Sequence, residues 1–331
     1  MSNRLLPALI LVPIAALVIP ASAAGQSSSK RWTAPRTPDG HPDLQGIWTN
    51  STMTQLERPE QFAGKQTLTE AEATAYEKTT IVQRDRDRRD GGADVDVGRA
   101  YNELFFDQGS QLARLNGTIR TSMVIDPPDG RIPPLTPEAQ KRQEALRAEA
   151  RLHPADGPEN RSLAERCLYW ATTGPPMLPG PYNNTYQIYQ TPGYVTIQSE
   201  MIHETRIIPT DGRPHVPANV RKWTGDPVGH WEGDTLVVDS TNFTGKTRFR
   251  GSDENLHVIE RFTRVAPDTI DYKFTIDDPS AFTRAWTAEL PLAATPGPIY
   301  EYACHEGNYA LLDILTGARA QEKKEANKTA K

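Results

Sequence analysis

Short alternating segments of β-branched and aromatic residues dominate the second half of the chain. After about residue 161 such segments recur at residues 186–190, 194–199, 205–208, 235–240, 257–265, 269–276, 285–290 and 299–304. The stretches between them carry turn residues, as in Thr191-Pro192-Gly193. Eight strands with short turns and no helix between them favour antiparallel pairing. We therefore predict a mainly β fold, an antiparallel lipocalin-like barrel or sandwich.

The first half of the chain predicts fewer strands and two helices. Strands are expected at residues 46–50, with Trp48 in the core, and at residues 118–125. Thr69 followed by Glu72 is a capping box, which predicts a helix to about residue 84. Thr136 before Pro137 starts a second helix to about residue 152. Both helices are highly charged, so we expect them to be peripheral and to cover the core.

The N-terminus has the pattern of a cleaved signal peptide. Arg4 precedes an apolar run at residues 5–20, and Ala21-Ser22-Ala23 is a small-residue cleavage site. The run is short for a bilayer-spanning helix, which needs about 20 apolar residues. We predict cleavage after Ala23 and a periplasmic or secreted protein that does not insert into a membrane. The expected organisation is an N-terminal arm with the covering helices at 24–160, a barrel core at 161–320 and a disordered tail at 321–331, with 24–320 as one structural unit.

Charge and cysteine content narrow the classes of partner. The net charge is −5, and removal of residues 1–23 would delete one basic residue and no acidic one. Such a chain has no basic field for nucleic acid or anionic lipid. The two cysteines, Cys167 and Cys304, are a disulfide candidate in an oxidising compartment, and two buried free thiols are the alternative.

Several motifs resemble those of a large family of secreted bacterial proteins. They are PDLQGIW (42–48), RIPPLTPEAQ (131–140), ERC (165–167), GPPM (174–177), GHWEGDTLVVD (229–239), LHVIERF (256–262) and YACHEGNY (302–309). The resemblance covers nearly the whole chain after residue 23. It implies export and a single unit, and it supplies no activity and no catalytic residue.

The arrangement of histidines is the strongest chemical signal, because common phosphate, zinc-protease and nucleophile-elbow motifs are absent. Five of the seven histidines lie among the predicted strands: His203, His215, His230, His257 and His305. An imidazole beside a carboxylate is typical of acid–base catalysis. We take His203, His257, His305 and Glu306 as candidate catalytic residues, each of which has a structural role as its alternative.

Strand alternation divides the LHVIERF segment between two faces. Val258, Glu260 and Phe262 share one face, which is expected to be core although Glu260 interrupts it. His257 and Arg261 share the other face, which either lines a cavity or faces water. In the first case Arg261 is a substrate contact.

Other candidates concern binding. The proline-rich segment 175–181, with Tyr182, Asn183 and Asn184, could form a rigid wall for sugars or phenolic rings, or a structural crossover. Tyr182, Asn184 and Trp286 are the candidate substrate-binding residues beside Arg261. No cofactor is expected; the alternative is a single divalent metal held by His203, His257 and His305, with Glu200 or Glu306.

Three functions are compatible with these observations. The favoured one is an exported enzyme, a hydrolase, lyase or isomerase, that uses His and carboxylate groups on a small organic molecule. The second is a lipocalin-like periplasmic carrier of an apolar or aromatic ligand. The third is a structural module of the cell envelope, which would expose an apolar patch.

Overall fold

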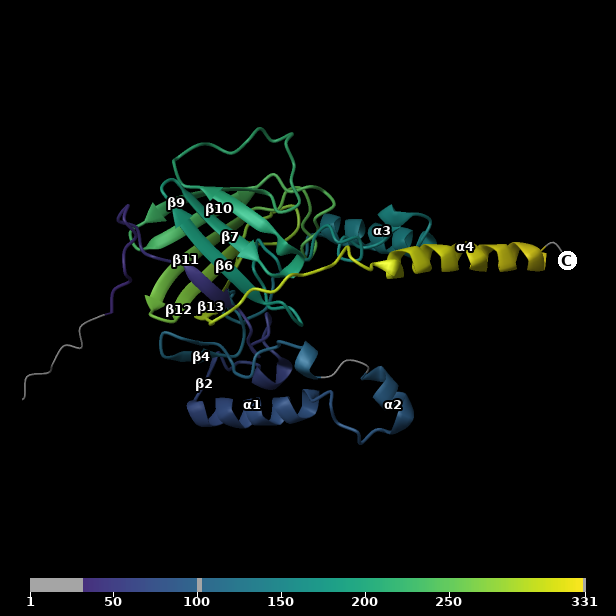
Figure 1. Cartoon of the computed structure of the whole chain (residues 1–331), viewed down its shortest axis with the longest axis horizontal. Helices are drawn as coiled ribbons and strands as arrows, with labels where there is room; N and C mark the ends of the chain where they lie inside the picture. Colours follow the sequence, from purple (N-terminus) through teal and green to yellow (C-terminus); the bar gives the residue numbers. More distant parts are fainter. Residues whose placement is uncertain (1–31, 100–102, 330–331) are drawn as a thin grey trace, which may run out of the picture. The chain divides into compact units, whose positions relative to one another are not determined.

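The computed structural model describes residues 32–99 and 103–329. The described residues from Thr33 onward belong to one compact unit. Its main element is a ten-stranded antiparallel sheet in the order β8-β7-β6-β1-β13-β12-β11-β10-β9, with β5 paired to β13 (Figure 1). The strands are β1 (Gly46–Thr49), β5 (Val124–Asp126), β6 (Thr185–Thr191), β7 (Tyr194–Ser199), β8 (Thr205–Pro209), β9 (Asp226–Glu232), β10 (Thr235–Thr241), β11 (Val258–Ala266), β12 (Thr269–Ile276) and β13 (Trp286–Ala294).

The sheet curls into a nearly closed barrel. Its two end strands, β8 and β9, lie in contact but are not joined by a hydrogen-bonded ladder. A Cβ atom on Gly229 of β9 would lie only 2.9 Å from the side chain of Ile208 in β8. We call this contact line the β8–β9 seam. The prediction of a mainly β, barrel-like fold is confirmed.

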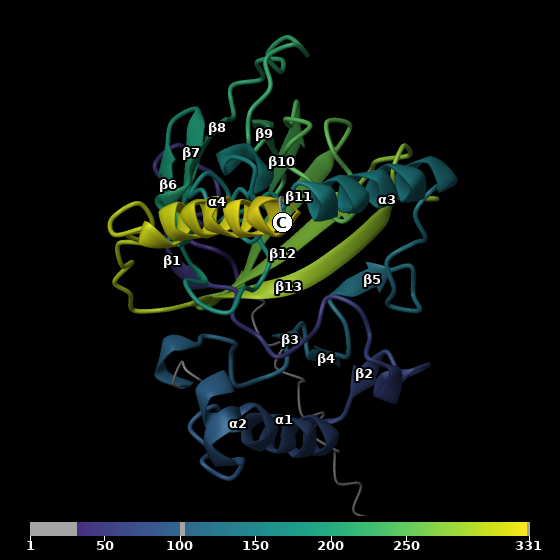
Figure 2. The ribbon, with the colours of Figure 1, turned by 90° about the vertical axis from the view of Figure 1, so that its right-hand side faces the viewer.

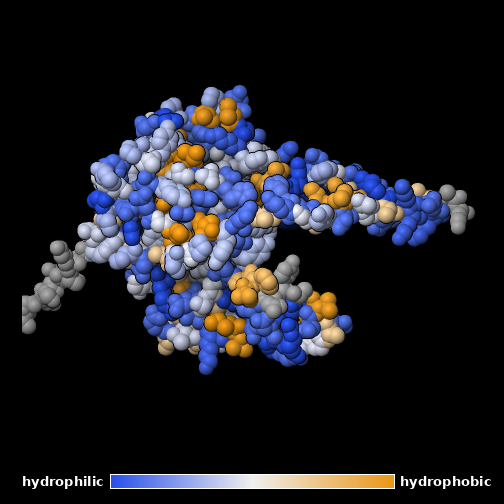
Figure 3. Space-filling view, in the orientation of Figure 1, coloured by the Kyte–Doolittle hydropathy of each residue, from blue (hydrophilic) through white to orange (hydrophobic). Residues whose placement is uncertain are grey.

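Large apolar side chains fill the inside of the barrel. Alternate residues of each strand point inward, and in β11 these are Val258, Glu260 and Phe262, all with no exposed surface. Trp48 and Trp286 are also fully buried. The face in Figure 3 is mainly hydrophilic, with separate small apolar spots. Burial of alternating apolar residues is therefore the main force that holds the sheet.

A second, smaller sheet lies beside the first helix (Figure 2). It contains β2 (Thr67–Leu68), β4 (Thr118–Arg120) and β3 (Arg114–Leu115), in that order. Helix α1 (Glu70–Arg84) begins at Thr69, where the predicted capping box with Glu72 is present. The helix buries Ala73 against Met53, Leu68, Leu112 and Ile119. Helix α1 therefore packs on this small cluster.

Three further α-helices lie within residues 32–99 and 103–329. Helix α3 (Pro137–Leu152) is capped by Thr136 as predicted, and its buried residue is Ala139. Helix α2 (Gly92–Gly98) is short, and α4 (Tyr309–Thr329) is long and mostly exposed. Helix α4 covers most of the segment for which the sequence predicts a disordered tail, because its Ala, Glu, Lys and Gln residues favour helix. None of the helices in the described ranges is long and apolar enough to cross a membrane.

Three strand predictions differ from the structure. The expected strand 118–125 is divided, since Thr121 leaves the strand to donate a hydrogen bond to the carbonyl of Lys65. β4 therefore joins the small sheet, and β5 joins the barrel. Strand β9 was not predicted, because Pro227 and Gly229 interrupt its alternation of apolar and polar residues. Both residues are tolerated there because β9 is an end strand of the sheet. Residues 299–304, predicted as a strand, form a loop.

Cys167 and Cys304 form a disulfide with an S–S distance of 2.00 Å, so the alternative of free thiols is wrong. The bridge attaches the segment before α4 to the turn at residues 162–167. The predicted signal peptide lies outside the described residues.

Candidate functional site

The structure does not bring the three candidate catalytic imidazoles together. His203 ends a short 3-10 helix before β8 and is exposed, and His305 and Glu306 are exposed after the disulfide. His257 lies just before β11 on its outer face, opposite the buried Val258. Among residues 32–99 and 103–329, no three His, Cys, Asp or Glu side chains are arranged to hold a metal. The face of His257 and Arg261 is the outer face, and Arg261 pairs there with Glu232 at 2.7 Å.

Two predicted binding residues have structural positions. Trp286 is fully buried and packs edge-on against Phe274 and Phe282, so it is a core residue. Asn184 is buried and accepts a hydrogen bond from the backbone N–H of Gly180 at 2.6 Å. It therefore holds the proline-rich loop against the start of β6.

Tyr182 and the proline-rich loop do line pockets. Tyr182 and Asn183 form a pocket of about 340 Å³ with Phe105 and Phe106. The loop segment 178–181 lines another pocket, of about 590 Å³, with residues of α1 such as Tyr76. The other half of the loop is buried, and the backbone N–H of Met177 donates to the hydroxyl of Tyr272 at 2.9 Å. The proline-rich loop is therefore a structural crossover in its buried half, and its other half forms a wall of the two pockets.

A third pocket, of about 490 Å³, lies at the β8–β9 seam. One side comes from residues 204–207 at the start of β8, and the other from residues 221–225 and Pro227 at the start of β9. No ladder closes the sheet here, so side chains rather than backbone bonds define the opening. We call this hollow the seam pocket.

Glu204 is the one acidic residue of the seam-pocket lining. Burial raises the pKa of its carboxyl, while a hydrogen bond from the Thr224 hydroxyl and the charges of Arg206 and His203 act in the opposite direction without cancelling it. The Thr224 hydroxyl lies 3.2 Å from Oε1. A carboxyl with a raised pKa keeps its proton to higher pH, which suits a proton donor.

The pKa of Asp226, at the start of β9, is shifted in the opposite direction to that of Glu204. Burial acts to raise its pKa, but hydrogen bonds from Lys222 and from the backbone N–H of Val216 outweigh burial, so the pKa is lowered. Lys222 Nζ, which also lines the seam pocket, lies 2.6 Å from Oδ1. Glu204 lines the hollow, whereas Asp226 is linked to it through Lys222, and the pKa values of the two carboxyls are moved apart.

Asp226 begins a chain of polar contacts along the outer face of the sheet. His215 Nδ1 lies 3.2 Å from Asp226 Oδ2, and His215 Nε2 lies 3.1 Å from Asp239 Oδ1. His257 Nε2 lies 3.0 Å from Asp239 Oδ2. Each ring nitrogen of His215 therefore contacts a carboxylate, and the chain of contacts runs from Lys222 to His257.

The pKa values of His257 and Asp239 reflect the hydrogen bond between them. The hydrogen bond from His257 lowers the pKa of Asp239, and the same bond raises the pKa of His257 against the effect of burial. Both side chains are about one-third exposed. The chain of contacts fixes the loop that carries His215, and through Asp226 it fixes Lys222 at the pocket.

A buried ion pair lies behind the seam pocket. Arg206, which lines the pocket, donates two hydrogen bonds to Glu260 on β11, at 2.7 and 3.1 Å. Burial acts to lower the pKa of Arg206, but attraction by Glu260 outweighs it and the pKa is raised. Tyr272 donates a further bond to Glu260 at 2.9 Å. This pair explains why Glu260 interrupts an otherwise apolar face.

Some of these residues have partial signals in the sequence. Glu204 stands beside His203, and His215 and His257 are among the five histidines of the strand region, but Lys222, Asp226 and Asp239 were missed. Asp239 has a detectable signal, because it is a charged residue that ends the apolar run Leu236-Val237-Val238. Asp226 precedes a strand that was not predicted.

Comparison with known proteins finds no protein-family model, no curated protein and no solved structure that matches the chain. The resemblance of its motifs to a secreted bacterial family therefore stays an expectation.

Proposed function

We propose that this protein is an exported enzyme that carries out acid–base chemistry on a small organic molecule in the seam pocket. The observation that carries the proposal is the raised pKa of Glu204 in a hollow that also holds Lys222. Perturbed carboxyls in clefts are concentrated at functional sites. The reaction class is a hydrolysis, elimination, hydration or isomerisation.

Each residue has a role in this scheme. Glu204 donates a proton to the reacting group and takes it back in the same cycle. Lys222 places a positive charge where negative charge develops on the substrate. Asp226, His215 and Asp239 are positioning residues, because they act through Lys222 and its loop. The Cys167–Cys304 disulfide supports a periplasmic or secreted location.

Turnover by matched variants tests the proposal. The purified chain would be incubated with esters, lactones, glycosides and hydroxy acids, and products would be followed by NMR. We expect Glu204→Gln to lower kcat by roughly 100-fold or more, and Glu144→Gln, an exposed change on α3, to leave it unchanged. The Gln variant should fold normally at neutral pH, because it removes a carboxylate whose ionisation burial disfavours.

A substrate-independent measurement accompanies this test. NMR titration of the Glu204 carboxyl should give a pKa above the ordinary value for glutamate. A pKa at or below that value, or equal turnover by the two variants, would contradict the assignment of Glu204 as the acid.

A carrier is the second candidate function, and one observation favours it. The pocket of Phe105, Phe106, Tyr182 and Asn183 combines three aromatic rings with an amide, which suits an aromatic ligand. A carrier would release a bound aromatic compound unchanged. Saturable binding that Tyr182→Ala abolishes, without any product, would favour this function over the enzyme.

A further inference from the structure

A small hollow beside the disulfide is lined mainly by positively charged residues. Its volume is about 250 Å³, and its four cations are Arg161, Arg166, Lys246 and Arg248. Glu159 is the one acidic residue of the lining. We call this hollow the basic pocket. It stands out in a chain whose net charge is −5.

The cations of the basic pocket are incompletely neutralised. Arg161 pairs with Glu165 at 2.6 Å, and Arg166 approaches Glu159 at 3.6 Å. Arg161 Nε is buried and has no hydrogen-bond partner among the described residues. A buried donor without a partner is costly, so the protein's own groups leave Arg161 partly unsatisfied.

Lys246 and Arg248 supply the other side of the pocket from the segment between β10 and β11. Neither side chain forms a hydrogen bond or ion pair within the described ranges, and both are exposed. Thr247 between them is buried, and its hydroxyl donates to the carbonyl of Trp223 at 2.8 Å. This anchor fixes the backbone from which the two cations project.

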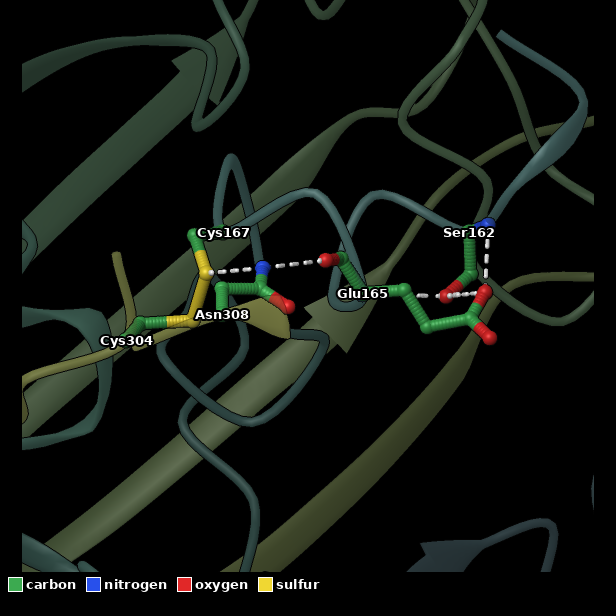
Figure 4. Close-up of a disulfide and its surroundings, with 5 residues drawn as sticks. All are labelled: Ser162, Glu165, Cys167, Cys304 and Asn308. Atoms are coloured by element: carbon green, nitrogen blue, oxygen red, sulfur yellow. Dashed lines mark hydrogen bonds between the residues drawn. A yellow bond between two sulfur atoms is a disulfide. The ribbon is translucent and has the colours of Figure 1, made fainter. Parts of the chain in front are cut away.

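The opposite side is held by covalent and polar links (Figure 4). Ser162 and Glu165 cap the turn reciprocally, with Ser162 N donating to Glu165 Oε2 at 2.9 Å. Asn308 donates to the carbonyl of Glu165 at 3.0 Å, and Cys167 is bridged to Cys304. The guanidinium groups of this side are therefore carried on a rigid turn, which lowers the entropic cost of binding.

We propose that the basic pocket binds a phosphate or sulfate group. Fixed arginine forks and a lysine are the groups that recognise such oxyanions. The volume is slightly below the roughly 300 Å³ at which pockets for whole drug-sized ligands begin. The occupant is thus either the free ion or the anionic end of a small molecule. The basic pocket shares no lining residue with the seam pocket.

Isothermal titration calorimetry on the full chain tests the proposal with inorganic phosphate, sulfate and glycerol phosphate at constant ionic strength. We expect saturable binding that the double change Lys246→Gln and Arg248→Gln weakens by roughly tenfold or more. The matched control is Arg131→Gln with Lys141→Gln, which removes the same charge from exposed positions outside the pocket. Tighter binding of glycerol phosphate than of phosphate would identify an organic phosphate as the occupant.

Two outcomes would overturn the proposal. One is the lack of saturable heat with all three probes at millimolar concentration. The other is equal weakening by the pocket pair and by the control pair, which would show a general charge effect. Circular dichroism of both double variants confirms that they are folded, and the four substituted side chains are all exposed.

Discussion

Charged side chains in this protein differ sharply in their surroundings. Arg206 and Glu260 have side chains at most 1% exposed and neutralise each other inside the barrel. Glu204 lies two residues before Arg206, on the same face of the chain, and lines the seam pocket. Its side-chain hydrogen-bond partner is the Thr224 hydroxyl and not a cation. The buried pair is a structural element, whereas Glu204 is free to exchange its proton.

The His257–Asp239 pair gives a pH-dependent prediction. Its folded state favours protonated His257 and ionised Asp239. A raised histidine pKa contributes stability that is complete below the unfolded pKa, about 6.5, and is lost as the pH rises through the folded value. Asp239→Asn should therefore reduce the free energy of unfolding more at about pH 6 than at about pH 9.

Urea denaturation of both proteins at the two pH values measures this difference. Asp96→Asn is the control, since Asp96 pairs with Arg89, which stays charged at both pH values. A loss of stability that is the same at both pH values would show that Asp239 acts only through uncharged contacts. NMR titration of His257 should also show its pKa fall in the Asn variant.

At the scale of elements, the seam is the place where the barrel depends on side-chain packing alone. Strand β12 is paired with β11 and with β13 along eight residue pairs each, but β8 and β9 share no ladder. Backbone groups on the facing edges of β8 and β9 are therefore not satisfied by one another. This leaves an opening for the seam pocket, since a complete ladder would close it.

Gly229→Ala tests the importance of close packing at the seam. The added methyl would lie 2.9 Å from Ile208 Cγ2 and 3.1 Å from Thr210 Cγ2. We expect a loss of about 1–3 kcal/mol in the free energy of unfolding, as for other overpacked sites. Gly317→Ala in α4 adds its methyl to open space and should cause no such loss. Equal stability of the two variants would mean that the seam opens freely.

At the scale of the whole molecule, the disulfide encloses all of the barrel strands from β6 to β13. Its cysteines are 137 residues apart in sequence. In the chain-entropy model a loop of this size stabilises the folded state by about 4–5 kcal/mol. Reduction should therefore lower the urea midpoint of the protein strongly.

Denaturation with and without reductant measures this effect. The double change Cys167→Ser and Cys304→Ser should resemble the reduced protein and should not respond to reductant. An unchanged midpoint on reduction would show that the bridge restrains only the segment before α4.

Local sequence determined most of the elements. Local patterns of apolar and polar residues predicted eight of the nine strands that follow β5 or form β1, all except β9, and Thr69 and Thr136 specified the starts of α1 and α3. These features depend on residues within one turn or one strand, so near neighbours are sufficient to reveal them.

Only the tertiary structure decided the sites. Alternation placed His257 and Glu260 on opposite faces but did not show that Glu260 would meet Arg206, 54 residues earlier, inside the barrel. The seam pocket likewise combines residues 204–207 with residues 221–225 and Pro227, and the basic pocket combines residues between 159 and 166 with Lys246 and Arg248. Such contacts arise from how the sheet curls and which strands become its ends. These are long-range outcomes of packing, and no local pattern encodes them.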